Sequence, residues 1–173
     1  NRYLAGVHLT GSADAGLHES LDGGATWKHI PDLEGISIEA LASFPGDSDR
    51  MLAATRKGVF LSSDGGRAWK RISPEGDLEL QAITAVSFDP EDPRTIFAGT
   101  THLPWKTTDE GATWRSIKTG MLDDSDVFSI YVDPRRPSRV FASACSGIYR
   151  SLNGGASWRK FLGIPGTHRR THV

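Results

Sequence analysis

The sequence predicts an all-β protein built from four copies of a four-stranded antiparallel unit, and two repeated signals predict it. An eight-residue box ending in tryptophan occurs four times, with its tryptophans 42, 45 and 44 residues apart. Ahead of each later box, a proline turn is followed eight residues on by an alanine, which precedes the box tryptophan by 16 residues in all three copies. Short antiparallel strands recurring at a period of about 40–45 residues are typical of β-propeller blades. The boxes are SLDGGATW (20–27), SSDGGRAW (62–69), TTDEGATW (107–114) and SLNGGASW (151–158).

The third copy shows how one unit is expected to fold. Residues 83–88 form the first strand because they are rich in β-branched and aromatic side chains. The turn at 89–93 holds two prolines, which have no N–H to donate within a sheet. A second strand is expected at 95–99, a third around 105–107 leads into the box, and a fourth lies at 113–117. Small residues in the innermost strands fit the crowded axis of a propeller.

The four units are expected to form a single domain over residues 1–173, either as a closed four-bladed ring or as part of a larger propeller. Residues 1–6 align with 49–54, so the chain begins at the second strand of its first blade. Residues 168–173 stand where a further or ring-closing strand would start, and open blade edges would allow two copies to associate as a homo-oligomer. Since residue 1 is not a methionine, a mature form or an excised piece is expected. The blades are expected at about residues 1–30, 36–72, 82–117 and 127–162.

Composition argues against several functional classes. The 20 Lys and Arg residues against 21 Asp and Glu give a formal net charge of −1, whereas nucleic-acid binders carry a sustained basic field. No apolar run reaches the roughly 18 residues of a spanning helix, so no membrane insertion is expected. Cys145 is the single cysteine, which rules out an intrachain disulfide. No base can be assigned to it from the sequence, so a nucleophilic role is not expected. The six histidines are spread over the blades without metal-ligand spacing, so neither a metal nor a cofactor is predicted.

The pattern [ST]-x-[DN]-x-G-x-[STA]-W of the four boxes resembles the Asp-box, or BNR, repeat of the sialidase superfamily over nearly the whole chain. That superfamily includes sialidases, xyloglucanase-type glycoside hydrolases, the sortilin propeller and photosystem II assembly and stability factors. The Asp-Pro turns and short boxes most resemble the photosystem factor group and the xyloglucanase-type propellers. The resemblance implies an extracellular or periplasmic location, although no export signal is visible, and it does not choose between an enzyme and a binding protein.

The boxes themselves are interpreted as structural. The aspartates can accept backbone N–H groups of their own turn, the glycines adopt conformations closed to most residues, and the tryptophans cover the hairpin. The fourth box carries an asparagine, which can cap the turn but cannot do acid–base chemistry, so a catalytic role for the boxes is not expected. The structural box residues are Ser20, Asp22, Gly24, Trp27, Ser62, Asp64, Gly66, Trp69, Thr107, Asp109, Gly111, Trp114, Ser151, Asn153, Gly155 and Trp158.

A ligand site is expected on the face opposite the boxes, here called the loop face. Its loops are the ones that depart most from the repeat, and they span residues 7–15, 31–35, 55–58, 73–81, 99–104, 118–126, 144–147 and 163–170. A six-residue insertion in the first blade adds polar groups, and Trp105 lies outside the box pattern. Trp105 either offers a platform for a sugar ring or takes the packing place of Phe60 and Tyr149. The candidate ligand-binding residues are His8, Asp14, Arg56, His102, Trp105 and Arg169.

The favoured function is a non-catalytic binding or assembly scaffold whose partner is a protein or a glycan. The alternative is a carbohydrate-active propeller, a glycoside hydrolase of the xyloglucanase type. Its carboxyl groups would come from the cluster Asp123, Asp124 and Asp126, facing Glu34, Glu75 or Asp77. For the same cluster the solvated-turn interpretation is favoured, because Asp124-x-Asp126 lacks the remaining ligands and the glycine of a calcium loop. The pair Arg135–Arg136 is interpreted as solvated charge on the face that carries the boxes.

Overall fold

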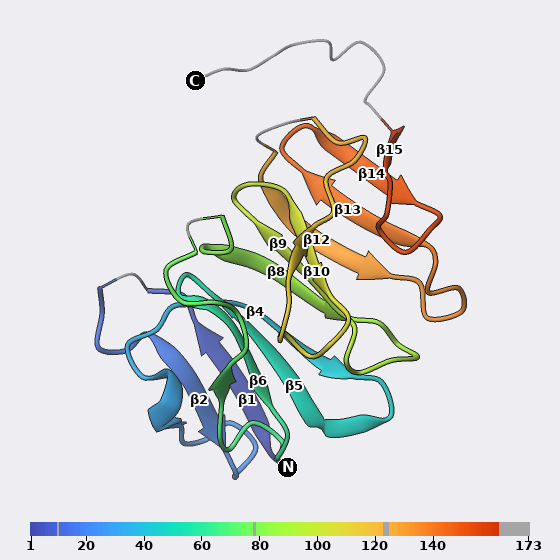
Figure 1. Cartoon of the computed structure of the whole chain (residues 1–173). Coiled ribbons are helices and arrows are strands. Elements are labelled where there is room, and N and C mark those ends of the chain that lie inside the picture. Colours follow the sequence, from blue (N-terminus) through green and yellow to red (C-terminus); the bar gives the residue numbers. More distant parts are fainter. Residues whose placement is uncertain (10, 78, 123–124, 163–173) are drawn as a thin grey trace.

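The computed structural model describes residues 1–9, 11–77, 79–122 and 125–162. They form four antiparallel sheets that follow one another in a curved row, with the N-terminal sheet at one end and the last sheet at the other (Figure 1). The described residues therefore make an open arc and not a closed four-bladed ring. The segment 168–173, expected to close that ring, lies outside the described residues.

Each sheet is a simple meander in which consecutive strands are neighbours. The first sheet has three strands, as the phase of the repeat predicts, and the other three have four. The first sheet contains β1 (Tyr3–Val7), β2 (Gly16–Ser20) and β3 (Lys28–His29), and a 3-10 turn η1 (Pro31–Leu33) leads to the second. The second contains β4 (Ile38–Phe44), β5 (Asp47–Thr55), β6 (Gly58–Ser62) and β7 (Lys70–Arg71). The third contains β8 (Ile83–Phe88), β9 (Ile96–Thr100), β10 (Pro104–Thr107) and β11 (Arg115–Ser116). The fourth contains β12 (Val127–Val132), β13 (Val140–Ala144), β14 (Gly147–Ser151) and β15 (Arg159–Leu162).

The strand register shows why the alanines recur. Ala53 lies opposite Phe60, and the same positions of the third sheet hold Ala98 and Trp105. In the fourth sheet, Ala142 lies opposite Tyr149. A small residue facing a large one lets neighbouring sheets approach and interlock, which is how a propeller fills its interior.

Apolar side chains between neighbouring sheets form the core. One cluster joins the second and third sheets, and another joins Phe97 of the third sheet to Val127, Ile130 and Val140 of the fourth. Strand β12 of the fourth sheet approaches β9 of the third closely at Gly99, where a Cβ atom would lie 2.8 Å from the carbonyl oxygen of Val127. The position therefore admits only glycine without a shift of the adjoining strand.

The outer face of the fourth sheet differs from the equivalent face of the third. Phe97 of the third sheet is fully buried by the fourth, whereas Phe141, at the matching register position, is only partly buried. Tyr131, Ile148 and Phe161 are exposed on the fourth sheet. The described residues thus leave uncovered a face of the kind that the other sheets cover with a neighbour.

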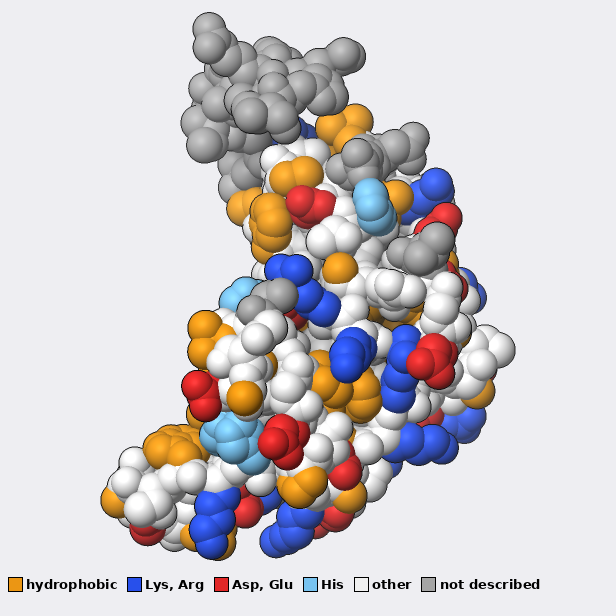
Figure 2. All heavy atoms as spheres, turned by 90° about the vertical axis from the view of Figure 1, so that its left-hand side faces the viewer, with side chains coloured by type: hydrophobic (Ala, Val, Ile, Leu, Met, Phe, Trp, Pro, Cys, Tyr) orange, Lys and Arg blue, Asp and Glu red, His pale blue; other side chains and the backbone are white. Residues whose placement is uncertain are grey.

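The surface carries charges of both signs. Figure 2 shows acidic and basic side chains interspersed among polar and hydrophobic ones on the face that it presents. In the part of the chain that the structure describes, no helix is long and apolar enough to cross a membrane.

Candidate functional site

Each box is a compact turn held by its own side chains. In the third box, Thr107 Oγ1 accepts the N–H of Gly111 at 2.9 Å and donates to Asp109 Oδ1 at 2.7 Å. Asp109 also accepts the N–H and the hydroxyl of Thr113, at 2.8 and 2.6 Å. The first box repeats this arrangement with Ser20, Asp22 and Thr26. The predicted hydrogen bonds to the aspartates are therefore present in the structure.

These hydrogen bonds keep the box carboxylates ionised. Those donated by Thr107 and Thr113 lower the pKa of Asp109 to about 2. The hydroxyl and N–H of Thr26 lower the pKa of Asp22 further below its usual range. In the fourth box, Asn153 Oδ1 accepts the N–H of Ser157 at 2.9 Å, and its amide donates to the Ser157 hydroxyl at 2.9 Å. An amide thus makes the same turn, which supports a structural role for the group at this position.

The box tryptophans also connect neighbouring sheets. Trp114 Nε1 donates to the carbonyl oxygen of Ile72 at 3.0 Å, and Trp158 Nε1 donates to that of Ile117 at 2.6 Å. Each of these bonds reaches back to the preceding sheet. Trp27 and Trp69 instead donate to a glycine carbonyl of their own box.

The loop face carries a charged cluster centred on Glu39. Its Oε2 lies 2.9 Å from His8 Nδ1, and its Oε1 lies 3.3 Å from Arg56 Nε. The Oγ of Ser37 lies 3.0 Å from the same His8 nitrogen. The Glu39 side chain is only 17 % exposed, against 53 % for His8 and 58 % for Arg56. The structure therefore brings together two predicted residues, from the first and second sheets, around a carboxylate that the sequence analysis missed.

A β-bulge places Glu39 at this edge. The pairing of β4 with β5 shifts between Ile38 and Ala40, which leaves Glu39 as the extra residue. The same shift occurs at Thr84 in β8 and at Phe128 in β12. Bulges interrupt the alternation of a strand and redirect one side chain. A glutamate in an otherwise uncharged innermost strand was the signal in the sequence that could have identified it.

The other candidate residues lie apart from this cluster. Asp14 is exposed in the loop between β1 and β2, where its N–H binds Ser12 Oγ at 3.1 Å. His102 is exposed in the loop between β9 and β10, and its N–H binds Thr100 Oγ1 at 2.8 Å. Trp105 packs against the core between the second and third sheets, in the register position of Phe60. This packing favours the structural interpretation of Trp105. Arg169 lies outside the described residues.

The structure describes part of the acidic loop before β12. Asp123 and Asp124 lie outside the described residues, whereas Asp126 is partly exposed and its carbonyl accepts the N–H of Cys145 at 3.0 Å. The neighbouring Ser125 is buried, and its hydroxyl lies 2.6 Å from that of Ser146. These bonds anchor the loop to the turn between β13 and β14.

Two of the histidines that the sequence analysis treated as scattered lie side by side. The Nε2 atoms of His18 and His29 are 3.1 Å apart on the paired strands β2 and β3. Burial and the adjacent imidazole lower the pKa of His18. Within the described ranges, no group of three or more His, Cys, Asp or Glu residues is placed to hold a metal ion.

The sequence matches no family model and no curated protein. The structure, in contrast, is similar to solved propellers. An ancestral GH74 enzyme superposes with a TM-score of 0.68 at 20 % identity, covering 88 % of this chain and 22 % of that one. The chain is a β-propeller. Two further neighbours agree. The GH74 xyloglucanase from Xanthomonas campestris has a TM-score of 0.65 at 19 % identity, covering 94 % and 28 % of the two chains. YCF48 from Cyanidioschyzon merolae has a TM-score of 0.59 at 16 % identity, covering 86 % and 53 %.

These similarities concern the fold. This propeller chain spans about a quarter of the two GH74 enzymes and about half of YCF48. The neighbours include both enzymes and a protein whose name carries no activity, so the fold alone does not assign chemistry to the chain.

Proposed function

We propose that this propeller is a non-catalytic binding scaffold that engages a protein or glycan partner through its loop face. The observation that carries the proposal is the cluster of His8, Glu39 and Arg56. Both oxygens of the Glu39 carboxylate are engaged by these two neighbours. The carboxylate therefore positions two exposed donor groups, the His8 ring and the Arg56 guanidinium. Such preoriented donors on a rigid scaffold suit recognition of a polar ligand.

The box geometry supports assigning the four repeats to the Asp-box type. The serine or threonine, the Asp or Asn and the glycine of each box take the same hydrogen-bonding positions in all four copies. The carboxylates among them are occupied by their own turns. This leaves the loop face as the place where an Asp-box propeller of this kind would bind its partner.

The rival proposal is a glycoside hydrolase that uses the acidic loop before β12. Such an enzyme needs two carboxyl groups roughly 5–9.5 Å apart across the scissile bond. Asp126 is the one described member of the predicted cluster Asp123, Asp124 and Asp126. The two proposals differ in one measurable outcome, the release of reducing sugar.

The test combines binding and hydrolysis. The chain is applied to a glycan array and a synthetic peptide array, and any bound probe is titrated against Arg56→Ala and Glu39→Gln. We expect saturable binding that Arg56→Ala weakens by about tenfold or more, since a charge-assisted hydrogen bond contributes roughly 1.5–3 kcal/mol. Arg67→Ala, which removes an exposed guanidinium from the face that carries the boxes, is the matched control and should bind as the parent does.

Hydrolysis of a glycan by this chain would contradict the scaffold proposal. The chain is incubated with xyloglucan and other β-glucans, and reducing ends are measured. Turnover that disappears in Asp126→Asn would establish the glycosidase instead. Equal loss of binding in Arg56→Ala and Arg67→Ala would show that the loop-face cluster is not the site.

A further inference from the structure

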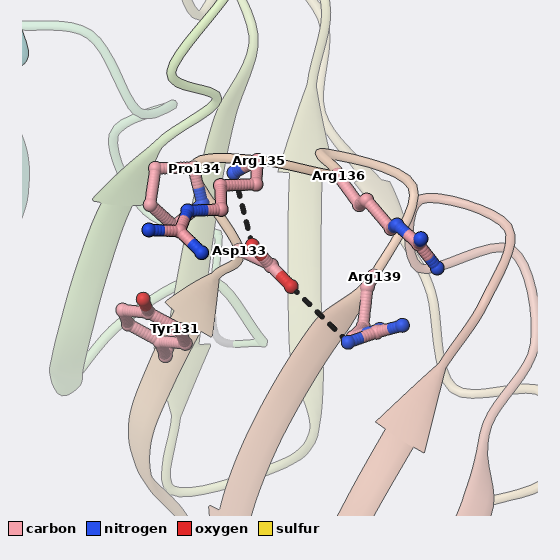
Figure 3. A pocket seen from close by; sticks show the side chains of 6 residues that line it. All are labelled: Tyr131, Asp133, Pro134, Arg135, Arg136 and Arg139. Carbon is pink, nitrogen blue, oxygen red and sulfur yellow. Dashed lines mark hydrogen bonds and ion pairs between the residues drawn. The ribbon is translucent and has the colours of Figure 1, made fainter.

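A second candidate site lies away from the loop face, at the turn between β12 and β13. The turn borders an open cavity of about 640 Å³. In Figure 3, Arg136 and Arg139 lie on one side of Asp133, and Arg135 lies on the other side close to Tyr131. The cavity is lined by Tyr131, Asp133, Pro134, Arg135, Arg136 and Arg139.

The backbone of this turn is held by several hydrogen bonds. The N–H of Asp133 donates to the carbonyl of Arg139 at 3.0 Å, and the N–H of Arg139 donates to that of Arg136 at 2.7 Å. Asp133 Oδ1 accepts the N–H of Arg135 at 2.9 Å. The three arginines therefore extend from a well-defined loop, so a ligand would not have to order the backbone that carries them.

The equivalent turn of the third sheet shows that the arginines are not needed for this backbone. There, the N–H of Asp89 donates to the carbonyl of Thr95 at 2.9 Å, and Asp89 Oδ1 accepts the N–H of Glu91 at 3.0 Å. The residues matching Arg135 and Arg136 are Glu91 and Asp92. The same turn thus forms with the opposite charge, so its backbone does not require the basic residues of the fourth sheet.

Two of the three guanidinium groups are available to a ligand. Arg139 lies 3.4 Å from Asp133 Oδ2, so this pair is internally balanced. Arg135 and Arg136 are exposed, and in the part of the chain that the structure describes neither forms an ion pair. Arg135 and Arg136 are interpreted from the sequence as solvated charge, and both are exposed; they also line a cavity that holds an exposed aromatic ring.

We propose that this cavity binds an acidic oligosaccharide through its carboxylate or sulfate groups. Arg135 and Arg136 would each hold an anionic group, and the Tyr131 ring, which is 56 % exposed and lies close to Arg135 in Figure 3, would stack on a sugar ring there. The cavity size is within the roughly 300–1,000 Å³ of small-molecule sites. Only Tyr131 and Pro134 offer apolar contact, which suits a saccharide better than a peptide that needs buried apolar anchors.

The experiment uses the full chain and two probes of the same charge chemistry, a sulfated heparin-derived hexasaccharide and an oligogalacturonide. Binding is measured by calorimetry at about 50 mM and 300 mM salt, because exposed ion pairs weaken as salt screens them. A neutral xyloglucan oligosaccharide and a poly-glutamate peptide complete the panel. We expect at least one acidic saccharide to bind, with an affinity that falls with salt, and the neutral one not to bind.

The decisive variant is the double substitution Arg135→Glu and Arg136→Asp, which gives the turn the charges of the third sheet. It should weaken acidic-saccharide binding at least tenfold while leaving the thermal midpoint unchanged. Lys28→Glu with Lys70→Asp changes the net charge equally at exposed positions of other sheets and should bind as the parent does. Equal weakening by both double variants would show a general charge effect and overturn the proposal. So would tighter binding of the peptide or of the neutral saccharide.

Tyr131→Ala distinguishes binding of a saccharide from binding of a small anion. It should weaken the hexasaccharide or the oligogalacturonide severalfold but leave inorganic sulfate binding unchanged, because only the sugar ring contacts the aromatic face. If both ligands responded equally, the cavity would be a simple anion site. Arg56→Ala, at the loop face, should leave this binding intact, so failure of one site is distinguishable from failure of the other.

Discussion

The third and fourth blades are two versions of one unit. Phe97 lies opposite Lys106 in the third blade, and Phe141 lies opposite Arg150 in the fourth. In both, a cation sits over an aromatic ring, Lys106 Nζ at 4.7 Å from the centroid of Phe97 and the Arg150 guanidinium at 4.6 Å from that of Phe161. The third blade is covered on both faces by described neighbours, whereas the fourth is covered on one. The same local design therefore serves as core in one blade and as surface in the other.

The largest expected effect measures that difference in burial. Phe97→Ala should lower the free energy of unfolding by about 3–5 kcal/mol, because it opens a cavity between the third and fourth blades. Phe141→Ala, at the matching position, should cost about 1 kcal/mol, as for a partly exposed side chain. Denaturant unfolding at neutral pH measures both.

Equal losses for the two phenylalanine variants would break the comparison. They would mean that the outer face of the fourth blade is covered in solution. The native mass from light scattering would then show whether a second copy of the chain covers it.

The repeat made much of this scaffold predictable from the sequence. Box spacing and the turn-to-alanine interval place Ala98, Ala142 and the strands around them, and the matching register places Trp105 with Phe60. The position of Glu39 could not be predicted in this way, because it depends on a shift in strand register. Glu39 reaches the loop face only because a bulge adds one residue to β4, and linear alternation cannot show that.

The other contacts that were not predicted join residues on different strands or at opposite ends of a turn. His18 and His29 lie on different strands, and the six-residue insertion ahead of β2 hides the fact that His18 takes the position of Phe60 and Tyr149. Arg139 joins Arg135 and Arg136 only after the turn closes through its hydrogen bonds. Charge patterning along the chain indicates a basic pair, but not the cavity beside it.

A smaller effect is expected at the two turns of opposite charge, the acidic one between β8 and β9 and the basic one between β12 and β13. Asp92 accepts the N–H of Arg94 at 3.0 Å and the Thr95 hydroxyl at 2.7 Å, so Asp92→Arg should destabilise the chain by about 1 kcal/mol. Arg136→Asp removes no hydrogen bond from its side chain, and its effect should stay within about 0.5 kcal/mol. Parallel urea titrations of the two single variants test this. A large loss in Arg136→Asp would show that the basic turn has a structural role after all.

The smallest effect compares the third and fourth boxes in acid. Asp109 has a pKa of about 2 in the folded chain, below its ordinary value of 3.8. Since the folded-state value is lowered, its contribution to stability is complete above about pH 4 and is lost as the pH falls through about 2. Asn153 does not titrate, so the fourth box contributes nothing to this pH dependence.

Exchanging the two residues should therefore move the acid sensitivity from one box to the other. Asp109→Asn should flatten the fall of the unfolding free energy between pH 4 and 2, and Asn153→Asp should steepen it. Urea midpoints measured from pH 2 to 5 give both slopes, with the boxes of Asp22 and Asp64 unchanged as an internal background. If Asn153→Asp left the slope unchanged, its carboxylate would lack the hydroxyl donors that lower the pKa of Asp109. Ser151 and Ser157 occupy the positions of Thr107 and Thr113, and their hydroxyls already contact Asn153, so the donors are in place. The fourth box is therefore expected to keep its backbone conformation with either Asn or Asp at position 153. Only the aspartate should make its stability depend on pH.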